Sequence, residues 1–201
     1  MAPFIVFEGG DGSGKTTQAK ALFRRLNSRG FPALLTREPG GTPLGESIRR
    51  RLKARRDVSP LSELLLFAAA RAQLVQNVVG PALGDGTIVV CDRYTASTVA
   101  YQGYGRGIDR VLIDQVNLAA TGGLSPDLIV LLDLPPELTL IRKRESAGDV
   151  FDAAPLEFHS KVREAYLSQA AHDPGHWVVL DATRPPGELT GEIWEKVQPL
   201  L

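Results

Sequence analysis

Cysteine is almost absent from this chain of 201 residues, and the one that occurs, Cys91, cannot form an intrachain disulfide and suits a reducing compartment. Charge of either sign is not in excess, since 23 Lys and Arg balance 23 Asp and Glu, which gives no support for a nucleic-acid or membrane partner. Apolar runs of the roughly 20 residues that span a bilayer do not occur. The first residues also lack the basic and apolar blocks of a secretory signal. We therefore expect a cytoplasmic protein.

The apolar segments that do occur predict an α/β fold. Strand-like runs rich in Ile, Val and Leu show no alternation, which is typical of strands buried on both faces. They lie at residues 4–7, 33–36, 87–91, 127–134 and 177–180. Segments with helical spacing separate them, at residues 15–29, 44–53, 60–83, 108–120, 136–144, 156–171 and 188–197. This alternation predicts one domain over residues 1–201, with a parallel five-stranded sheet flanked by helices. The weakly periodic stretch near residues 142–153 is predicted to be a short lid.

A glycine-rich segment directly follows the first predicted strand and precedes a predicted helix. It matches G-x-x-x-x-G-K-T, a loop whose backbone N–H groups surround phosphate oxygens at a helix N-terminus. In such a loop Lys15 reaches the β- and γ-phosphates, and the Thr16 hydroxyl binds Mg²⁺. We expect a nucleoside triphosphate at the loop residues Gly9, Gly10, Asp11, Gly12, Ser13, Gly14, Lys15, Thr16 and Thr17.

Asp11 and Arg71 are charged where the local pattern does not demand a charge. A carboxylate inside the phosphate loop would be repelled by the triphosphate, so Asp11 either faces a hydroxyl of a second substrate or is a solvated turn residue. Arg71 interrupts an apolar helix stripe one turn after Phe67. Together, Phe67 and Arg71 could bind a nucleobase. The alternative is an arginine paired to a structural carboxylate.

Two further arginines follow predicted strands. Asp92 and Arg93 come directly after the third strand, and Arg37 follows the second. Ligands of open parallel sheets collect at the carboxyl ends of the strands. Asp92 and Arg93 could therefore reach phosphates and metal-bound water, although a structural ion pair is the alternative. If the next segment is helical, Arg93, Ser97 and Tyr101 share one side of it.

These motifs, taken in order, resemble bacterial thymidylate kinase over nearly the whole length. The resemblance is carried by Phe7–Thr17, Thr36–Thr42, Phe67–Arg71, Asp92-Arg93-Tyr94, Ser97-Thr98, Tyr101-Gln102-Gly103 and Gly105-Arg106-Gly107. It implies a P-loop NTPase fold and the ATP- and Mg²⁺-dependent phosphorylation of dTMP to dTDP, in a homodimer.

The resemblance also assigns residues to the second substrate. It implies that Phe67 stacks on thymine, that Arg71 hydrogen-bonds a thymine carbonyl, and that Thr98 and Gln102 line the base pocket. It further implies that Arg93 and Arg37 hold the dTMP phosphate, that Asp11 faces the 3′-hydroxyl, and that Tyr101 crowds the 2′-position. Asp92 is expected near the metal with Thr16. The Glu38–Pro39 bond resembles the family's cis-proline turn, which aims Arg37 inward.

The chain departs from this family at the lid. Bacterial relatives carry an arginine in an Asp-Arg-Phe/Ile-Glu segment, where this sequence has Val150 within 149–152. A cation for the transferring phosphoryl group must then come from residues 142–144. Arg144 continues an inward stripe through Leu138 and Ile141, so we expect it to act, with Arg142 as the second choice.

Other functions fit the sequence less well. A switch GTPase would need an Asn-Lys-x-Asp motif after a late strand, but the last strand leads into Asp181-Ala182-Thr183-Arg184. An ATPase driven by nucleic acid would need a basic face, which the neutral composition does not support. A kinase for a different nucleoside monophosphate is the nearest alternative.

Overall fold

The computed structural model describes residues 2–54, 58–145 and 155–201. Its centre is a five-stranded, all-parallel sheet in the order β2-β3-β1-β4-β5. The strands are β1 (Phe4–Glu8), β2 (Ala33–Arg37), β3 (Ile88–Asp92), β4 (Leu128–Asp133) and β5 (Trp177–Asp181). This confirms the predicted fold class and every predicted strand.

Four of the strands extend one residue further than their apolar runs. They end at Glu8, Arg37, Asp92 and Asp181, because backbone pairing continues beyond the apolar core. In a parallel sheet these polar ends meet at one edge. The register places Phe7 beside Asp92, which brings the phosphate loop level with the segment after β3.

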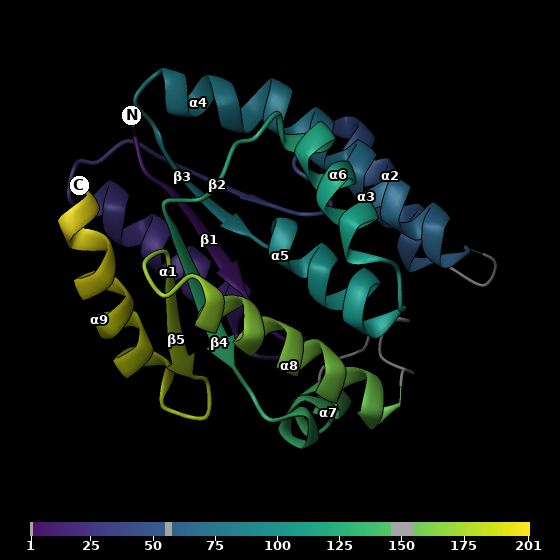
Figure 1. The fold of residues 1–201 in the computed structure, drawn as a ribbon. Helices are drawn as coiled ribbons and strands as arrows, with labels where there is room; N and C mark the ends of the chain where they lie inside the picture. The colour runs from purple at the N-terminus through teal and green to yellow at the C-terminus, as the bar shows by residue number, and fades with distance from the viewer. Residues whose placement is uncertain (1, 55–57, 146–154) are drawn as a thin grey trace.

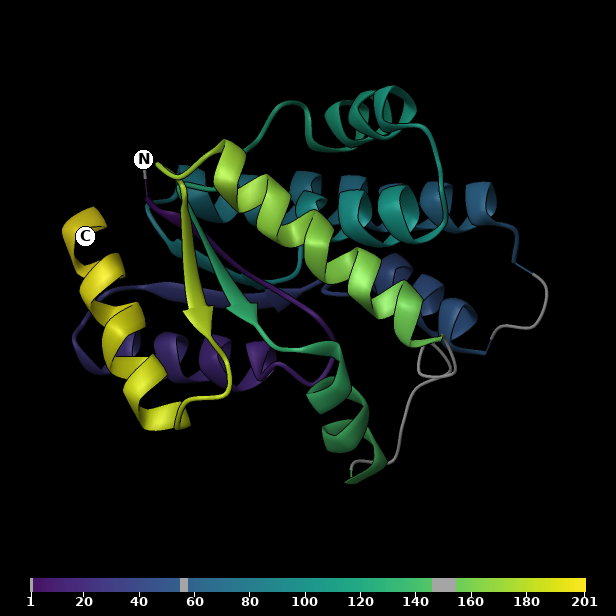
Figure 2. The same ribbon diagram turned by 60° about the horizontal axis from the view of Figure 1, so that its bottom comes forward.

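Helices cover both faces of the sheet (Figures 1 and 2). Residues of α1 (Lys15–Ser28) and α9 (Pro186–Val197) bury one face together with Ile5, Phe7 and Leu132. The opposite face is covered by α3 (Pro60–Leu74), the π-helical segment η1 (Val75–Val79) and α4 (Gly80–Gly84). The remaining described helical segments are α2 (Pro43–Lys53), α5 (Thr95–Thr98), the π-helical η2 (Val99–Gly105), α6 (Arg110–Thr121), α7 (Pro136–Glu145), α8 (Leu156–His172) and the 3₁₀ turn η4 (Gln198–Leu200).

The predicted helix 60–83 is not one regular α-helix. It contains η1, where the Gly80 N–H bonds to the carbonyl of Val75, five residues back. Pro81 accounts for the wider turn, because it lacks an N–H and its ring would collide with the carbonyl four residues earlier. The helical segment α5–η2 was predicted only conditionally, and it is present. Among the described residues no helix is long and apolar enough to cross a membrane.

Candidate active site

The phosphate loop lies between β1 and α1. Gly9, Gly12 and Gly14 have φ values of 136°, 70° and 94°, in a region that side chains disfavour. At Gly9 a Cβ atom would lie 2.4 Å from the Leu132 carbonyl oxygen, so only glycine fits there. The N-terminus of α1 follows at Lys15, which places free backbone N–H groups beside the loop, as an anion site requires.

Lys15 is folded back onto this loop. Its Nζ donates to the Gly10 carbonyl at 2.6 Å and lies 3.5 Å from Ser13 Oγ. The side chain is 6% exposed. Burial and, to a smaller extent, nearby Arg93 lower the pKa of Lys15 to about 8, against the opposing effect of Asp92 and Asp11. The negative charge of a bound polyphosphate would stabilise the charged form of the Lys15 side chain.

Thr16 and Asp92 meet where α1 begins and β3 ends. The Thr16 hydroxyl donates to Asp92 Oδ2, and both Thr16 and the neighbouring Thr17 are exposed. Among the described residues no group of three or more His, Cys, Asp or Glu side chains could hold a metal ion. Mg²⁺ commonly uses one or two protein oxygens and completes its shell with phosphate and water. The Thr16–Asp92 pair therefore suits this ion.

Arg93 lies at the centre of the site. Its φ of 76° is left-handed, which costs roughly 1–3 kcal/mol in a residue other than glycine. The guanidinium donates to the Gly9 carbonyl (3.2 Å) and to Ser97 Oγ (3.1 Å), and Nη2 forms an ion pair with Asp11. It also donates to the Tyr101 hydroxyl at 3.3 Å and lies 5.0 Å from that ring's centre. Arg93, Ser97 and Tyr101 thus share one side, as predicted, and Asp11 is not a solvated turn residue.

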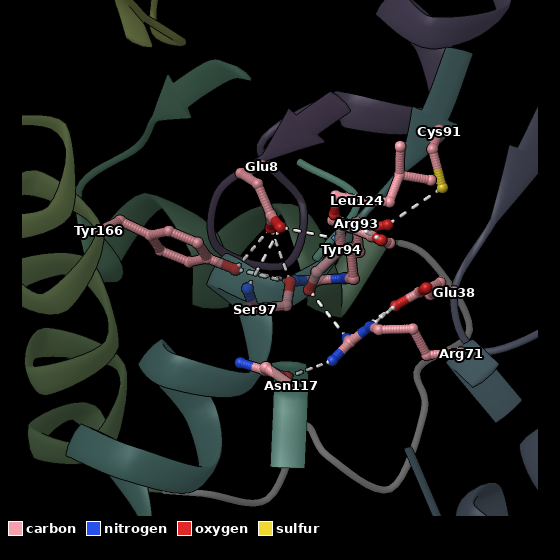
Figure 3. Close-up of polar contacts among 10 residues, drawn as sticks. All are labelled: Glu8, Glu38, Arg71, Cys91, Arg93, Tyr94, Ser97, Asn117, Leu124 and Tyr166. Atoms are coloured by element: carbon pink, nitrogen blue, oxygen red, sulfur yellow. Dashed lines mark hydrogen bonds and ion pairs between the residues drawn. The ribbon is translucent and has the colours of Figure 1, made fainter. Parts of the chain in front are cut away.

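Sequence reasoning missed the residue that anchors the segment directly after Arg93. Glu8, the fully buried last residue of β1, accepts from the Tyr94 N–H at 2.8 Å and from the Ser97 N–H at 3.2 Å. Its other oxygen accepts from Ser97 Oγ at 2.6 Å and from the Tyr166 hydroxyl at 3.0 Å (Figure 3). Burial raises the pKa of Glu8, and Arg93 opposes this. A charged residue ending an apolar strand was the available signal.

Arg71 lies deeper, with only 2% of its surface exposed. Its guanidinium donates to Glu38 Oε2 (2.8 Å), Asn117 Oδ1 (2.6 Å) and the Tyr94 carbonyl (3.0 Å), as Figure 3 shows. Burial raises the pKa of Glu38, and Arg71 counteracts that rise. The pairing to a structural carboxylate, which the sequence left open, is therefore present. Whether Arg71 also contacts a base stays a prediction.

The predicted base-pocket residues come from α3 and from the α5–η2 segment. Thr98 and Gln102 are both 2% exposed, one turn apart, and Phe67 on α3 is half-buried. Gln102 Nε2 donates to Glu63 Oε1 at 2.6 Å. Glu63, buried on α3 one turn before Phe67, was not singled out in the sequence.

Arg37, the last residue of β2, lies at the edge of the site. It follows the predicted strand, and the Glu38–Pro39 bond is cis, as predicted. The Arg37 side chain is 53% exposed and pairs with Glu46 at 3.0 Å. Because Arg37 ends β2, it lies on the ligand side of the sheet. Its pairing to Glu46 was not predicted.

The predicted lid cations fall in the second half of α7 (Pro136–Glu145). Helix α7 extends to Glu145, so Arg142 and Arg144 belong to it, but their side chains and residues 146–153 of the predicted lid lie outside the described residues. Ile141 is 53% exposed. The inward stripe that favoured Arg144 is therefore wrong at Ile141, because Leu138 packs against the core whereas the Ile141 side chain is exposed.

Comparisons with known proteins agree with this geometry. A family model described as thymidylate kinase matches residues 7–193. The chain is 48% identical to a thymidylate kinase of Dehalococcoides mccartyi, over 100% of the chain and 98% of that protein. It is 49% identical to one of Deinococcus radiodurans, over 96% and 95%. The crystal structure of thymidylate kinase from Ehrlichia chaffeensis superimposes with a TM-score of 0.82 at 35% identity, covering 98% of each chain. The chain has the P-loop NTPase fold and belongs to the thymidylate kinase family.

Proposed function

We propose that this site phosphorylates dTMP to dTDP with ATP, and that Arg93 supplies the positive charge where the two substrates meet. One observation carries the assignment to this site. The Arg93 guanidinium contacts both the carbonyl of Gly9 in the phosphate loop and the side chain of Asp11. A cation held against the loop at this point would lie between a triphosphate in the loop and a monophosphate bound beside it.

The chemistry requires charge rather than a general base. A phosphomonoester has a second pKa of about 6, so the attacking oxygen of dTMP is already mostly ionised at neutral pH. The barrier lies in bringing two anions together and in stabilising charge spread over the transferring group. Lys15 and the α1 N-terminus hold the ATP phosphates, and Arg93 with Arg37 holds the phosphate of dTMP.

Mg²⁺ is part of this proposal. Thr16 and Asp92 would hold it, because they offer hard oxygen donors beside the loop. When bound, Mg²⁺ neutralises charge on the phosphates of the nucleotide. The contribution of the chain is to keep both oxygens at the junction of α1 and β3.

The remaining residues would select the second substrate. Phe67 would stack on thymine, with Arg71 at its carbonyl and Thr98 and Gln102 beside it. Tyr101, held against Arg93, would occupy the space of a ribose 2′-hydroxyl. The Asp11 carboxylate would turn from Arg93 to the 3′-hydroxyl of the sugar.

A cation from α7 would complete the site. We propose Arg144 or Arg142 for this role, because the loop between Gly9 and Lys15 contains no arginine. The kcat of Arg144→Ala and of Arg142→Ala, with Lys143→Ala as the matched control, identifies the residue. Normal turnover in all three variants would refute a cation from α7.

A panel of nucleoside monophosphates tests the function directly. The purified protein with ATP and MgCl₂ is given dTMP, dUMP, dCMP, dAMP and dGMP in turn, and ADP formation is measured. We expect the highest kcat/KM for dTMP. Equal or faster turnover of a purine monophosphate would refute the proposal.

We also propose a homodimer formed through α3 and α6. Four apolar side chains are at least half exposed on these adjacent helices: Leu61, Leu65, Val111 and Leu118. Exposed apolar groups that gather on one face favour a protein partner. Light scattering should report a dimer for the wild type and a monomer for Val111→Glu combined with Leu118→Glu. Val179→Glu, at an exposed apolar position on the edge strand β5, is the matched control and should stay dimeric.

We propose a cytoplasmic location. The support is the single cysteine, Cys91, which is buried in β3 as a free thiol and needs no oxidising compartment. Fractionation of cells that express the tagged protein tests this, and recovery from another compartment would refute it.

A further inference from the structure

Two helix faces oppose each other beside the proposed thymine site. Along α3, Glu63 and Arg71 lie two turns apart on one face. On the opposing segment, Tyr94 precedes α5 and Gln102 lies in η2. Glu63 bonds to Gln102 at 2.6 Å, and Arg71 bonds to the Tyr94 carbonyl at 3.0 Å. The two segments are therefore antiparallel to each other and joined at two points.

The midpoints of the two faces are Phe67 and Thr98. Phe67 lies four residues from both Glu63 and Arg71 on α3, and Thr98 lies four residues before Gln102, so helical spacing turns each toward the side of its segment that carries these contacts. The proposed function places the pyrimidine ring in the space between these two sides. Gln102 lies at one end of that space and Arg71 at the other.

The bond to Glu63 determines which group of Gln102 is available to a base. A glutamine amide carries a donor NH₂ and an acceptor carbonyl, and a carboxylate can only accept. The oxygen and nitrogen of an amide are assigned from such bonds, and here the assignment is forced by the partner. With one N–H of the NH₂ bonded to Glu63 Oε1, the amide is held in one orientation, and Gln102 Oε1 is the acceptor that it can offer to a ligand.

We propose that Glu63 is a positioning residue that selects pyrimidines with an N–H at ring position 3. It does so by fixing the Gln102 amide with its carbonyl oxygen toward the base. The inference rests on the proposed function, since it assumes that the base lies between Phe67 and Thr98.

The donor and acceptor patterns of the bases give this orientation its effect. Thymine and uracil present an N–H at position 3 next to a carbonyl at position 4, whereas cytosine presents a bare nitrogen next to an amino group. Arg71 can only donate, which matches the carbonyl, and Gln102 Oε1 can only accept, which matches the N–H. Cytosine would leave buried polar groups unpaired at both points, and this is an effective way to reject a substrate.

A structural ion pair is the competing explanation for Glu63. Arg106 lies 3.5 Å from Glu63 Oε2 and is itself about one-third exposed. If Glu63 served only this ion pair, its replacement would change stability but not the relative use of the three pyrimidine substrates.

The experiment compares kcat/KM for dTMP, dUMP and dCMP in wild type and Glu63→Gln. The amide that replaces Glu63 can accept from Gln102 or donate to it, so the Gln102 amide loses its fixed orientation. We expect the dTMP/dCMP ratio to fall at least tenfold, because a charged hydrogen bond no longer selects one orientation. The dTMP/dUMP ratio should stay within twofold, since both bases carry the same N–H. An unchanged dTMP/dCMP ratio overturns the proposal.

A swapped pair keeps the test decisive if the single variant is poorly folded. In Glu63→Gln combined with Gln102→Glu, the amide donates to the carboxylate, and an acceptor oxygen again faces the base. We expect this variant to recover the dTMP/dCMP ratio to within about threefold of wild type, and a ratio that stays low overturns the proposal. Glu192→Gln, which changes an Arg184 ion pair distant in sequence, should leave all three values unchanged. Absence of dTMP turnover in the wild type would instead refute the proposed function.

Discussion

Arg71 and Arg93 are two arginines of one site, but Arg71 is buried, Arg93 is half-buried, and their surroundings differ. Arg71 is closed in by a buried carboxylate, an amide and a carbonyl, so its charge is balanced inside the protein. Arg93 sits beside the phosphate loop, where most of its partners are neutral hydroxyls and a carbonyl. Its one carboxylate partner, Asp11, is about one-quarter exposed.

The difference separates two uses of the same side chain. An arginine whose charge is balanced by a buried carboxylate helps to order the side chains packed around it and presents its N–H donors in a fixed position. A charge held mainly by hydroxyls and carbonyls, with a single partly exposed carboxylate, keeps more of its field for a ligand, because neutral partners do not cancel it. Arg93 thus has the surroundings expected for transition-state charge in a thymidylate kinase, and Arg71 those of a fixed binding group.

Removing Arg93 should give the largest effect on catalysis. For Arg93→Met we expect kcat to fall by about 10³-fold or more, because an arginine acting on phosphoryl-transfer charge has this magnitude. The melting temperature should change little, since the hydroxyl partners can bond to water. Arg163→Met, which removes a partly exposed arginine paired to Asp133, is the control. A kcat within tenfold of wild type for Arg93→Met would show that Arg93 does not supply transition-state charge and so does not differ from Arg71 in this way.

Removing Arg71 should act first on stability. Arg71→Ala leaves the Glu38 carboxylate buried without its cation, and we expect a loss of about 3 kcal/mol in the free energy of unfolding. Arg71→Gln combined with Glu38→Gln removes both charges and should regain most of this stability. The dTMP KM should nevertheless stay raised in the double variant, with the ATP KM unchanged. A normal dTMP KM there would leave Arg71 with a structural role only.

Glu8→Gln tests what holds Arg93 in its conformation. The new amide group would face the donors of Tyr94 and Ser97, so we expect a loss of about 2 kcal/mol in stability. The kcat should fall more than either KM changes, because the phosphate-binding groups are present but misplaced. Denaturant unfolding and steady-state kinetics measure the two effects. If kcat is unchanged in folded Glu8→Gln, Glu8 only packs the strand end.

Much of this arrangement could be predicted because its causes are local. The buried strands and the phosphate loop are continuous in sequence, and the rule that ligands collect at strand ends brought Asp92 and Arg93 to the loop. The same rule placed Asp92 near the loop, where it accepts a hydrogen bond from Thr16, a bond that was not itself predicted.

The partners of those residues could not be predicted, because they are distant in sequence. Glu8 lies 158 residues from Tyr166, and Arg71 lies 46 residues from Asn117. No periodicity encodes such contacts. The stripe through Ile141 failed for a related reason, since a helical pattern gives the spacing of a face but not whether each position on it packs against the rest of the protein.

Lys15 should give the smallest effect, a proton taken up when ATP binds. Its pKa of about 8 in the free protein means that about half of these side chains are neutral at pH 8. Phosphate charges favour the ammonium and raise this pKa, so binding at pH 8 should take up about half a proton. Near pH 6.5 Lys15 is already charged, and the uptake from this residue should approach zero. Calorimetric titration of ATP in buffers of different ionisation enthalpy measures the protons, with Lys15→Met as the control that should lack the difference between the two pH values. Equal proton uptake at pH 6.5 and 8 in the wild type would show that burial does not perturb the pKa of Lys15. Its side chain, like that of Arg71, would then be fully charged before the nucleotide binds.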